Sequence, residues 1–176
     1  MSTAPPIWPR EERRPYGVPV TTATPAWVGE LQDALGPGGV LLDRDVTAAY
    51  ARDQAMLAPA GTPAAVVLPR STDDVVAVMR TASRHGVAVV PRGAGSGLAG
   101  ASNAVDGAIT MVMTRMDAVL EVSPADRLAV DQPGVVNKAL RDAVAGAGLF
   151  YPPDPTATTG APSAATSRPT PAACAA

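Results

Sequence analysis

The segment Val87–Gly100, VAVVPRGAGSGLAG, constrains the fold of this chain more than any other stretch. Its β-branched start predicts a strand, and after Pro91 the chain enters a loop with glycine at positions 93, 95, 97 and 100. Glycine reaches positive φ without steric cost, and successive N–H groups in such a loop can converge on an anion, typically a phosphate. Each glycine also costs about 0.5–1 kcal/mol of chain entropy relative to alanine. This density of glycine therefore favours a ligand-binding loop, with a flexible surface loop as the alternative.

The end of this loop, Gly95–Gly100, formally matches the GxGxxG pattern of dinucleotide-binding Rossmann units. That pattern requires a strand before the glycines and a helix after them. Residues 101–107 predict a turn instead, and the apolar run Ala108–Met113 follows at once. Asp117 lies near the spacing of a ribose-binding acid, but it sits in a polar turn after that run. A P-loop is excluded because no Gly-Lys-Ser/Thr follows the glycines. The pattern therefore predicts a pyrophosphate site between two strands, without a helix dipole behind it.

Three other stretches accompany the loop and extend a resemblance to a known family. The loop itself, Arg92–Gly100, resembles the pyrophosphate loop of FAD-linked oxidases of the vanillyl-alcohol oxidase/p-cresol methylhydroxylase (PCMH) type. Residues 63–75 resemble the opening strand and helix of that domain, and residues 130–135 and 151–155 resemble two later stretches. The combination, over about residues 26–155, is most similar to the glycolate oxidase flavoprotein subunit and related D-2-hydroxyacid dehydrogenases. It implies an α+β fold, a truncated PCMH-type FAD-binding domain with a small parallel βαβ sheet packed on a second mixed sheet.

The resemblance also implies the cofactor and the chemistry. Relatives with covalently bound FAD have a histidine where this chain has Ser96, so the implied state is non-covalent FAD. The implied activity is oxidation of a 2-hydroxy acid of the glycolate or D-lactate type to a 2-oxo acid, with hydride transfer to FAD and then electron transfer to an acceptor that the sequence does not identify. A partner redox subunit is also compatible with the resemblance. No catalytic residue or metal ligand can be named. The residues expected to bind FAD are Pro91, Arg92, Gly93, Ala94, Gly95, Ser96, Gly97, Leu98, Pro133, Gly134, Asp154 and Pro155.

Composition narrows the partners and the compartment. The net charge is −2 and the basic residues are scattered, which argues against nucleic acid or an anionic membrane as the main partner. No apolar run approaches the roughly 20 residues of a transmembrane helix. Cys174 is the only cysteine, so an intramolecular disulfide is impossible and a reducing, cytoplasmic location is expected. The N-terminus lacks the apolar core of a signal peptide.

Periodicity predicts the helices. One is expected over Ala26–Leu35, stopped by Gly36, and a weakly helical stretch over Asp45–Met56, with Tyr50 as its packing anchor. A third begins at the N-cap Ser71 and ends at Gly86, and a fourth spans Val135–Ala147. The residues expected to form the buried stripe of the third helix are Val75, Val76, Met79 and Ala82. His85, the only histidine, is interpreted as a cation at the C-terminus of that helix, with a catalytic role as the alternative.

Short apolar runs predict the strands, at residues 64–68, 87–90, 108–113, 118–122 and 128–131. The first two are expected to be parallel, joined by the third helix. The resulting organisation is a disordered proline-rich arm (1–25), a helical segment (26–58), an incomplete FAD-binding domain (59–155) and a low-complexity tail (156–176).

The tail departs from the resemblance after Pro155. Residues 156–176 are rich in Ala, Thr, Pro and Ser and cannot bury a useful core. When Ala161–Ala176 is read one frame over, with permitted codons, it spells TIGGNVATNAGGLRC, a segment of the kind that the resembled family carries here. We therefore hypothesise a one- or two-base insertion or deletion shortly after Pro155. On this hypothesis the chain is a fragment of an FAD-dependent oxidoreductase that binds FAD weakly or not at all and is inactive alone. The alternatives are a nucleotide-binding module completed by another polypeptide and an inert frameshift product.

Overall fold

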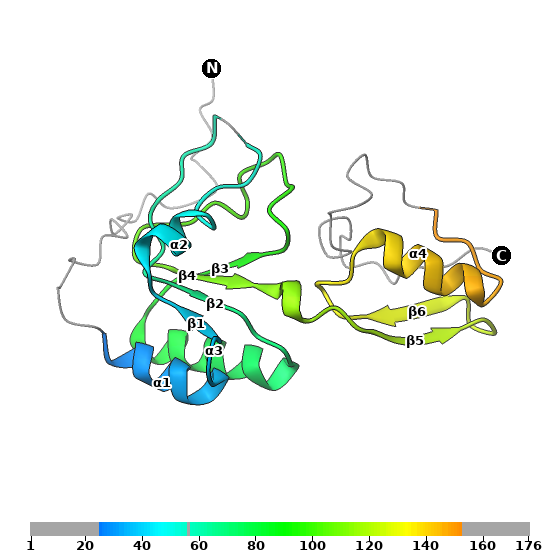
Figure 1. Ribbon diagram of the computed structural model, residues 1–176, viewed down its shortest axis with the longest axis horizontal. Coiled ribbons are helices and arrows are strands. Elements are labelled where there is room, and N and C mark those ends of the chain that lie inside the picture. Colours follow the sequence, from blue (N-terminus) through cyan, green and yellow to red (C-terminus); the bar gives the residue numbers. More distant parts are fainter. Residues whose placement is uncertain (1–24, 56, 153–176) are drawn as a thin grey trace, which may run out of the picture.

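The computed structural model describes residues 25–55 and 57–152, so nearly all of the expected arm and the whole of the tail lie outside the described part. The described chain contains helices and strands in mixed order (Figure 1). In chain order they are α1 (Ala26–Leu35), β1 (Val40–Leu41), α2 (Arg44–Ala48), β2 (Ala65–Val67), α3 (Thr72–His85), β3 (Val89–Arg92), β4 (Ile109–Val112), the 3-10 turn η1 (Met113–Arg115), β5 (Val119–Ser123), β6 (Leu128–Asp131) and α4 (Asn137–Gly146).

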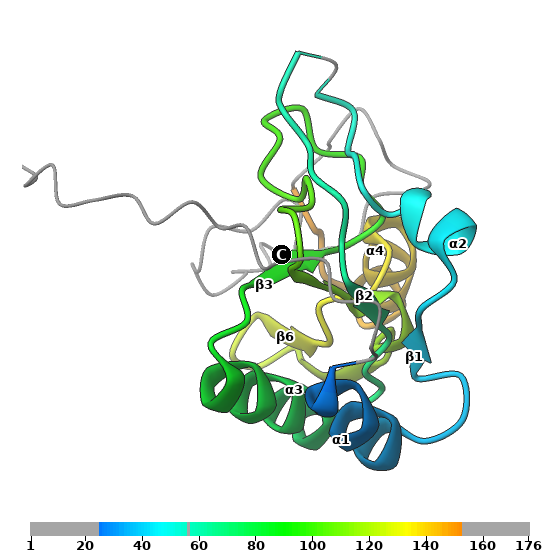
Figure 2. The ribbon, with the colours of Figure 1, turned by 90° about the vertical axis from the view of Figure 1, so that its left-hand side faces the viewer.

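A four-stranded sheet in the order β1-β2-β4-β3 is the centre of the larger lobe. β2, β4 and β3 run parallel, as the βαβ pattern predicts, and β1 adds an antiparallel edge strand. Helices α1 and α3 cover one face of this sheet, and the long loops cover the other (Figures 1 and 2). The core between the helices and the sheet is made of small and medium apolar side chains. Its buried members are Trp27, Val28, Leu31, Leu35, Ala65, Val67, Val78, Ala82, Ile109 and Met111.

The predicted boundaries of α3 are confirmed by its caps. Ser71 Oγ accepts a hydrogen bond from the backbone N–H of Asp74 at 3.1 Å, and Gly86 ends the helix with φ of 64°. The predicted buried stripe is wrong in part, because Val76 and Met79 are exposed, Met79 by 47%. Val78 is buried instead. Packing against the sheet and α1 decides which face of α3 is buried. The apolar periodicity of the helix alone does not distinguish a face with Met79 from one with Val78.

The second expected helix is also shorter than predicted. Only Arg44–Ala48 is helical, with the side chain of Asp43 capping its N-terminus, and the chain from residue 51 to 64 forms no helix or strand where it is described. Tyr50 nevertheless packs as predicted, against a small cluster on the loop-covered face of the sheet. That cluster contains Val66, Leu68 and Val112.

A smaller lobe follows β4 (Figure 1). β5 and β6 pair antiparallel, with Val119 opposite Asp131 and Ser123 opposite Leu128, and α4 lies against this pair. Their shared core contains Val135, Leu140, Val144, Leu149 and Tyr151. The small parallel sheet and the second sheet expected from the sequence are therefore both present, and among the described residues the second is an antiparallel pair.

Candidate functional site

The glycine loop connects two strands that are parallel and adjacent. β3 ends at Arg92 and β4 begins at Ile109, and the two pair in parallel register. Such a connection must return the chain to the opposite end of the sheet, and an α-helix usually does this. Here residues 93–108 contain no helix, and the connection passes over the sheet face opposite α1 and α3 (Figures 1 and 2). The sequence predicts that no helix follows the glycines, which argues against a Rossmann unit, and the structure confirms this prediction.

Arg92 lies buried beneath this loop. Side chains alternate between the two faces of a strand, so Arg92 shares the loop-covered face with Val90. Arg92 is only 8% exposed, and its Nη1 atom has no hydrogen-bond partner among the described residues. Burial lowers the pKa of Arg92 below its ordinary value, while the nearby negative charge of Asp53, and then Tyr50, acts in the opposite direction. An arginine nevertheless stays protonated at neutral pH. The floor of the loop therefore carries a buried and incompletely paired positive charge.

Gly95 of the loop lies directly against this guanidinium, while Gly100 packs elsewhere. Gly95 has φ of 73°, and a Cβ at this position would lie 2.5 Å from Cζ of Arg92 and still closer to Nη2. A residue other than glycine would therefore meet both backbone strain and a direct overlap. At Gly100 a Cβ would lie 2.5 Å from Cβ of Ala58, so that glycine is required by packing within the protein.

The outer part of the loop offers unused backbone donors. The N–H groups of residues 94–98 make no hydrogen bond to the described residues. N–H groups without partners among the described residues, next to a buried guanidinium, are the kind of donors that bind an anion with several oxygens, such as a phosphate or pyrophosphate. The Nη1 atom of Arg92, which has no hydrogen-bond partner among the described residues, fits such a group.

The other residues predicted to bind the cofactor lie in different places. Pro91 is exposed within β3, and Leu98 at the tip of the loop is 81% exposed. Gly134 is buried, and its N–H donates to Met116 O at 2.8 Å. Pro133 precedes it and is half-buried, at the junction of the two lobes. Asp154 and Pro155 lie outside the described residues. The structure thus gathers residues 92–98 at one place and puts Pro133 and Gly134 on a separate turn.

Sequence reasoning missed a second component of the site. Residues 51–55 and 57–62, which the sequence pattern divides between a weak helix and the start of the expected FAD-binding domain, lie against the glycine loop. The negative charge of Asp53 acts on Arg92 and raises its pKa, against the larger effect of burial. The backbone N–H of Asp53 donates to Asn103 Oδ1, and Ser102 Oγ donates to the carboxylate of Asp53. The available signal was the residue type, since Asp and Asn in an irregular stretch commonly bond to nearby backbone groups.

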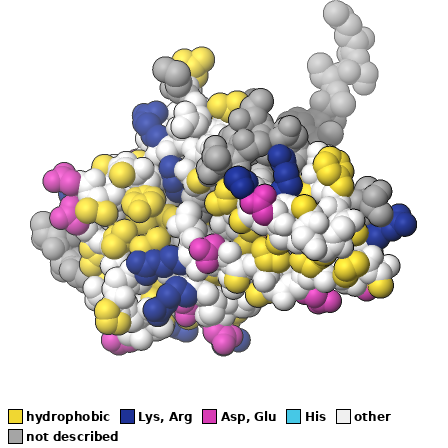
Figure 3. Space-filling view, turned by 45° about the vertical axis from the view of Figure 1, so that its right-hand side comes forward, with side chains coloured by type: hydrophobic (Ala, Val, Ile, Leu, Met, Phe, Trp, Pro, Cys, Tyr) yellow, Lys and Arg dark blue, Asp and Glu magenta, His cyan; other side chains and the backbone are white. Residues whose placement is uncertain are grey.

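Other kinds of site find no support in the described part of the chain. Residues 25–55 and 57–152 contain no group of three or more His, Cys, Asp or Glu side chains that could hold a metal ion. Within the same ranges, no helix has the length and apolar character needed to cross a membrane. Basic and acidic side chains occur together on the face shown in Figure 3, with no continuous basic patch there.

Comparison with known proteins gives a consistent result. The model of an FAD-binding domain family matches residues 63–167. D-2-hydroxyglutarate dehydrogenase of Stutzerimonas stutzeri is 41% identical over 131 residues, covering 74% of this chain and 28% of that protein. Glycolate oxidase subunit GlcD of Bacillus subtilis is 39% identical over 93 residues, covering 53% and 20%. The solved structure of p-cresol methylhydroxylase with substrate bound superposes with a TM-score of 0.67 at 18% identity, covering 77% and 27%, which shows the fold. The chain thus spans less than a third of each of these proteins.

Proposed function

This chain belongs to the FAD-binding domain family, and from that premise we propose that its glycine loop holds the pyrophosphate of a non-covalently bound FAD. The resemblance noted in the sequence is confirmed at the level of the family, of its FAD cofactor and of the PCMH-type fold. The assignment of individual contacts is our proposal. In it, the backbone N–H groups of Gly93–Leu98 and the guanidinium of Arg92 bind the phosphate oxygens.

The buried guanidinium is the observation that carries this proposal. Burial of a charge is costly unless the charge is paired, and Arg92 has no ion pair among the described residues. A pyrophosphate would supply the missing negative charge, and hydrogen bonds to charged groups contribute about 1.5–3 kcal/mol each. Pro133, Gly134, Asp154 and Pro155 are proposed to border the remainder of the cofactor, as their resemblance to family stretches implies.

The family fixes the class of chemistry, and the relatives suggest the substrate. Members related to this chain are oxidoreductases, and bound FAD supplies the hydride acceptor. We propose that the parent activity is oxidation of a 2-hydroxy acid to a 2-oxo acid. The names of the two curated relatives, a hydroxyacid dehydrogenase and a glycolate oxidase subunit, support this class of substrate. The second name also supports a partner redox subunit. A cytoplasmic location remains our proposal, supported by the single cysteine.

The proposed site predicts weak binding by this chain alone. In this proposal the described residues contact the pyrophosphate, while the chain spans only 28% of the hydroxyglutarate dehydrogenase. We expect FAD and ADP to bind the purified chain reversibly, with FAD lost on desalting. Isothermal titration with FAD, ADP and riboflavin tests this. ADP should compete with FAD and riboflavin should not, because riboflavin lacks the pyrophosphate. No saturation by FAD or ADP at millimolar concentration would overturn the proposal, and FAD retained stoichiometrically through desalting would overturn the prediction of weak binding.

A pair of arginine variants tests the role of the buried charge. Arg92→Gln removes the guanidinium beneath the loop, and Arg80→Gln removes the same charge from the exposed surface of α3. Loss of one or more charged hydrogen bonds should weaken ADP binding about tenfold or more in Arg92→Gln. ADP binding by Arg80→Gln should match that of the native chain. Equal affinities for all three proteins would contradict the assignment of Arg92.

A further inference from the structure

A segment that precedes the matched FAD-binding domain is joined to the glycine loop. We call the described residues 51–55 and 57–62 the latch segment. It lies beside residues 93–107 above the sheet, where the two loops rise together in both ribbon views (Figures 1 and 2). Four backbone hydrogen bonds join the two segments. They run from Gln54 N–H to Gly97 O at 3.0 Å, from Ala104 N–H to Ala51 O at 2.8 Å, from Gly61 N–H to Ala104 O at 2.6 Å and from Gly107 N–H to Thr62 O at 3.0 Å.

Asn103 is the side chain that connects the two segments most extensively. It is only 6% exposed. Its Oδ1 accepts from the backbone N–H of Asp53 at 2.8 Å, and its Nδ2 donates to Pro59 O at 3.1 Å and to Ala58 O at 3.5 Å. Every partner belongs to the latch segment, 44 to 50 residues away in sequence. One buried amide therefore holds both ends of the latch segment to the end of the glycine loop.

Close backbone approach fixes the register of this contact. A Cβ at Gly100 would lie 2.5 Å from Cβ of Ala58. A Cβ at Gly61 would lie 2.7 Å from Oδ1 of Asp106 and closer still to its backbone N. Real Cβ atoms do not occupy such positions, so neither glycine could be replaced without moving one segment away from the other. The two segments therefore form one interlocked unit.

The latch segment also brings a charge to the site. Asp53 accepts from the N–H of Ala55 at 2.8 Å and from Ser102 Oγ at 3.4 Å, and its Oδ2 faces the Cβ side of Gly97. Its carboxylate favours the charged form of Arg92, although the two residues form no ion pair. The latch segment thus contacts the backbone of the loop and also acts electrostatically on the arginine beneath it.

We propose that the latch segment is a wall of the cofactor site, and that Asn103 is a positioning residue that holds the glycine loop in its pyrophosphate-binding form before the ligand arrives. This inference rests on the proposed function. A loop that is already ordered loses less conformational entropy on binding, so its affinity for the ligand is higher. Without Asn103 the loop samples open forms, and the apparent affinity falls by the fraction of time that it is closed.

Asn103→Ala tests the inference, with Val78→Ala as its control. Val78 is fully buried on the opposite, helix-covered face of the sheet, so its truncation lowers stability without touching the loop. Hydrogen exchange is measured by mass spectrometry without ligand, and ADP affinity by titration. In Asn103→Ala we expect faster exchange in residues 51–62 and 93–107, unchanged exchange in α1 and α3, and ADP binding weakened about tenfold. In Val78→Ala we expect faster exchange in α1 and α3 and native ADP affinity.

The outcomes separate this inference from the proposed function. If the native chain shows no saturable binding of ADP or FAD, the proposed function fails and the binding part of the inference fails with it. The exchange pattern then decides the positioning role of Asn103 independently. If the native chain binds ADP, but Asn103→Ala binds it equally well or shows native exchange in residues 51–62, the inference is overturned while the proposed function stands. Equal losses of affinity in Asn103→Ala and Val78→Ala would assign the effect to general destabilisation and would also overturn it.

Discussion

Replacement of Gly95 by alanine is the most direct test of how the loop and Arg92 fit together. Gly95 has φ of 73°, and in this conformation a Cβ costs about 1–2 kcal/mol. The same Cβ would lie 2.5 Å from Cζ of Arg92 and closer to Nη2, so the guanidinium must move. Displacement of the guanidinium removes a charged hydrogen-bond donor from the site, a loss of about 1.5–3 kcal/mol per bond. We therefore expect Gly95→Ala to weaken ADP binding by about one to two orders of magnitude.

Gly86→Ala is the matched control for backbone strain. Gly86 ends α3 with φ of 64°, and a Cβ there would meet no atom within 4 Å. It should therefore lose about 1–2 kcal/mol of unfolding free energy with no change in ADP affinity. Urea denaturation measures the first quantity and isothermal titration the second. Gly95→Ala should be less stable than Gly86→Ala, because it adds the overlap with Arg92. If the two variants are equally stable and both bind ADP like the native chain, the proposed fit between Gly95 and Arg92 is wrong.

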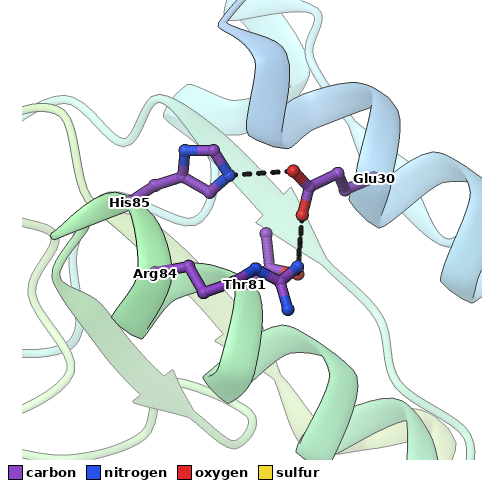
Figure 4. Close-up of polar contacts among 4 residues, drawn as sticks. All are labelled: Glu30, Thr81, Arg84 and His85. Atoms are coloured by element: carbon purple, nitrogen blue, oxygen red, sulfur yellow. Dashed lines mark hydrogen bonds and ion pairs between the residues drawn. The ribbon is translucent and has the colours of Figure 1, made fainter.

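Three further predictions concern stability and the gene. Glu30 on α1 contacts Arg84 and His85 on α3 (Figure 4), and hydrogen bonds from His85 and then Arg84 lower its pKa below 4.5. The resulting stabilisation is present above pH about 4.5 and is lost as the pH falls through the lowered pKa. The difference in unfolding free energy between the native chain and Glu30→Gln should therefore shrink as the pH falls, which denaturation at a series of pH values measures. A difference that grows as the pH falls would contradict this. Ser71→Ala should cost about 1 kcal/mol of unfolding free energy, measured in urea, because the N-cap bond is lost; an unchanged midpoint would refute the cap's contribution. DNA across the codon of Pro155 should show a shifted frame that continues with the glycine-rich family segment, and without such a frame the chain should be studied as a nucleotide-binding module.

Local physical chemistry explains why much of the fold could be predicted. The N-cap of α3 at Ser71 and the C-cap at Gly86 are decided by residues within one helical turn. The buried face of α1 follows from the spacing of its large apolar residues, and these are buried: Trp27, Val28, Leu31 and Leu35. The position of the glycine loop after a strand follows from the same kind of local pattern. The missing helix after the loop was also readable, because residues 101–107 carry no helical period.

Other features depended on contacts distant in sequence. The choice of Val78 over Met79 as a core residue is made by α1 and the sheet, because two helical phases differ by a single position. The reasons why glycine is required at each loop position also depend on distant contacts. Gly95 is required by Arg92, while Gly100 is required by Ala58, 42 residues earlier in the chain, so a shared sequence pattern hides two different causes.

The sequence by itself determined the order of strands and helices, apart from β1, and the loop that binds the pyrophosphate in our proposal, since each depends on local backbone preference or on a contiguous motif. The cofactor class followed from the resemblance of those motifs to a known family. Only the tertiary structure decided that Arg92 is buried without an ion pair to any described residue, and that Asn103 connects the loop to the latch segment. The physical reason is that burial and long-range hydrogen bonding belong to pairs of segments. No property of either segment alone records which partner covers it.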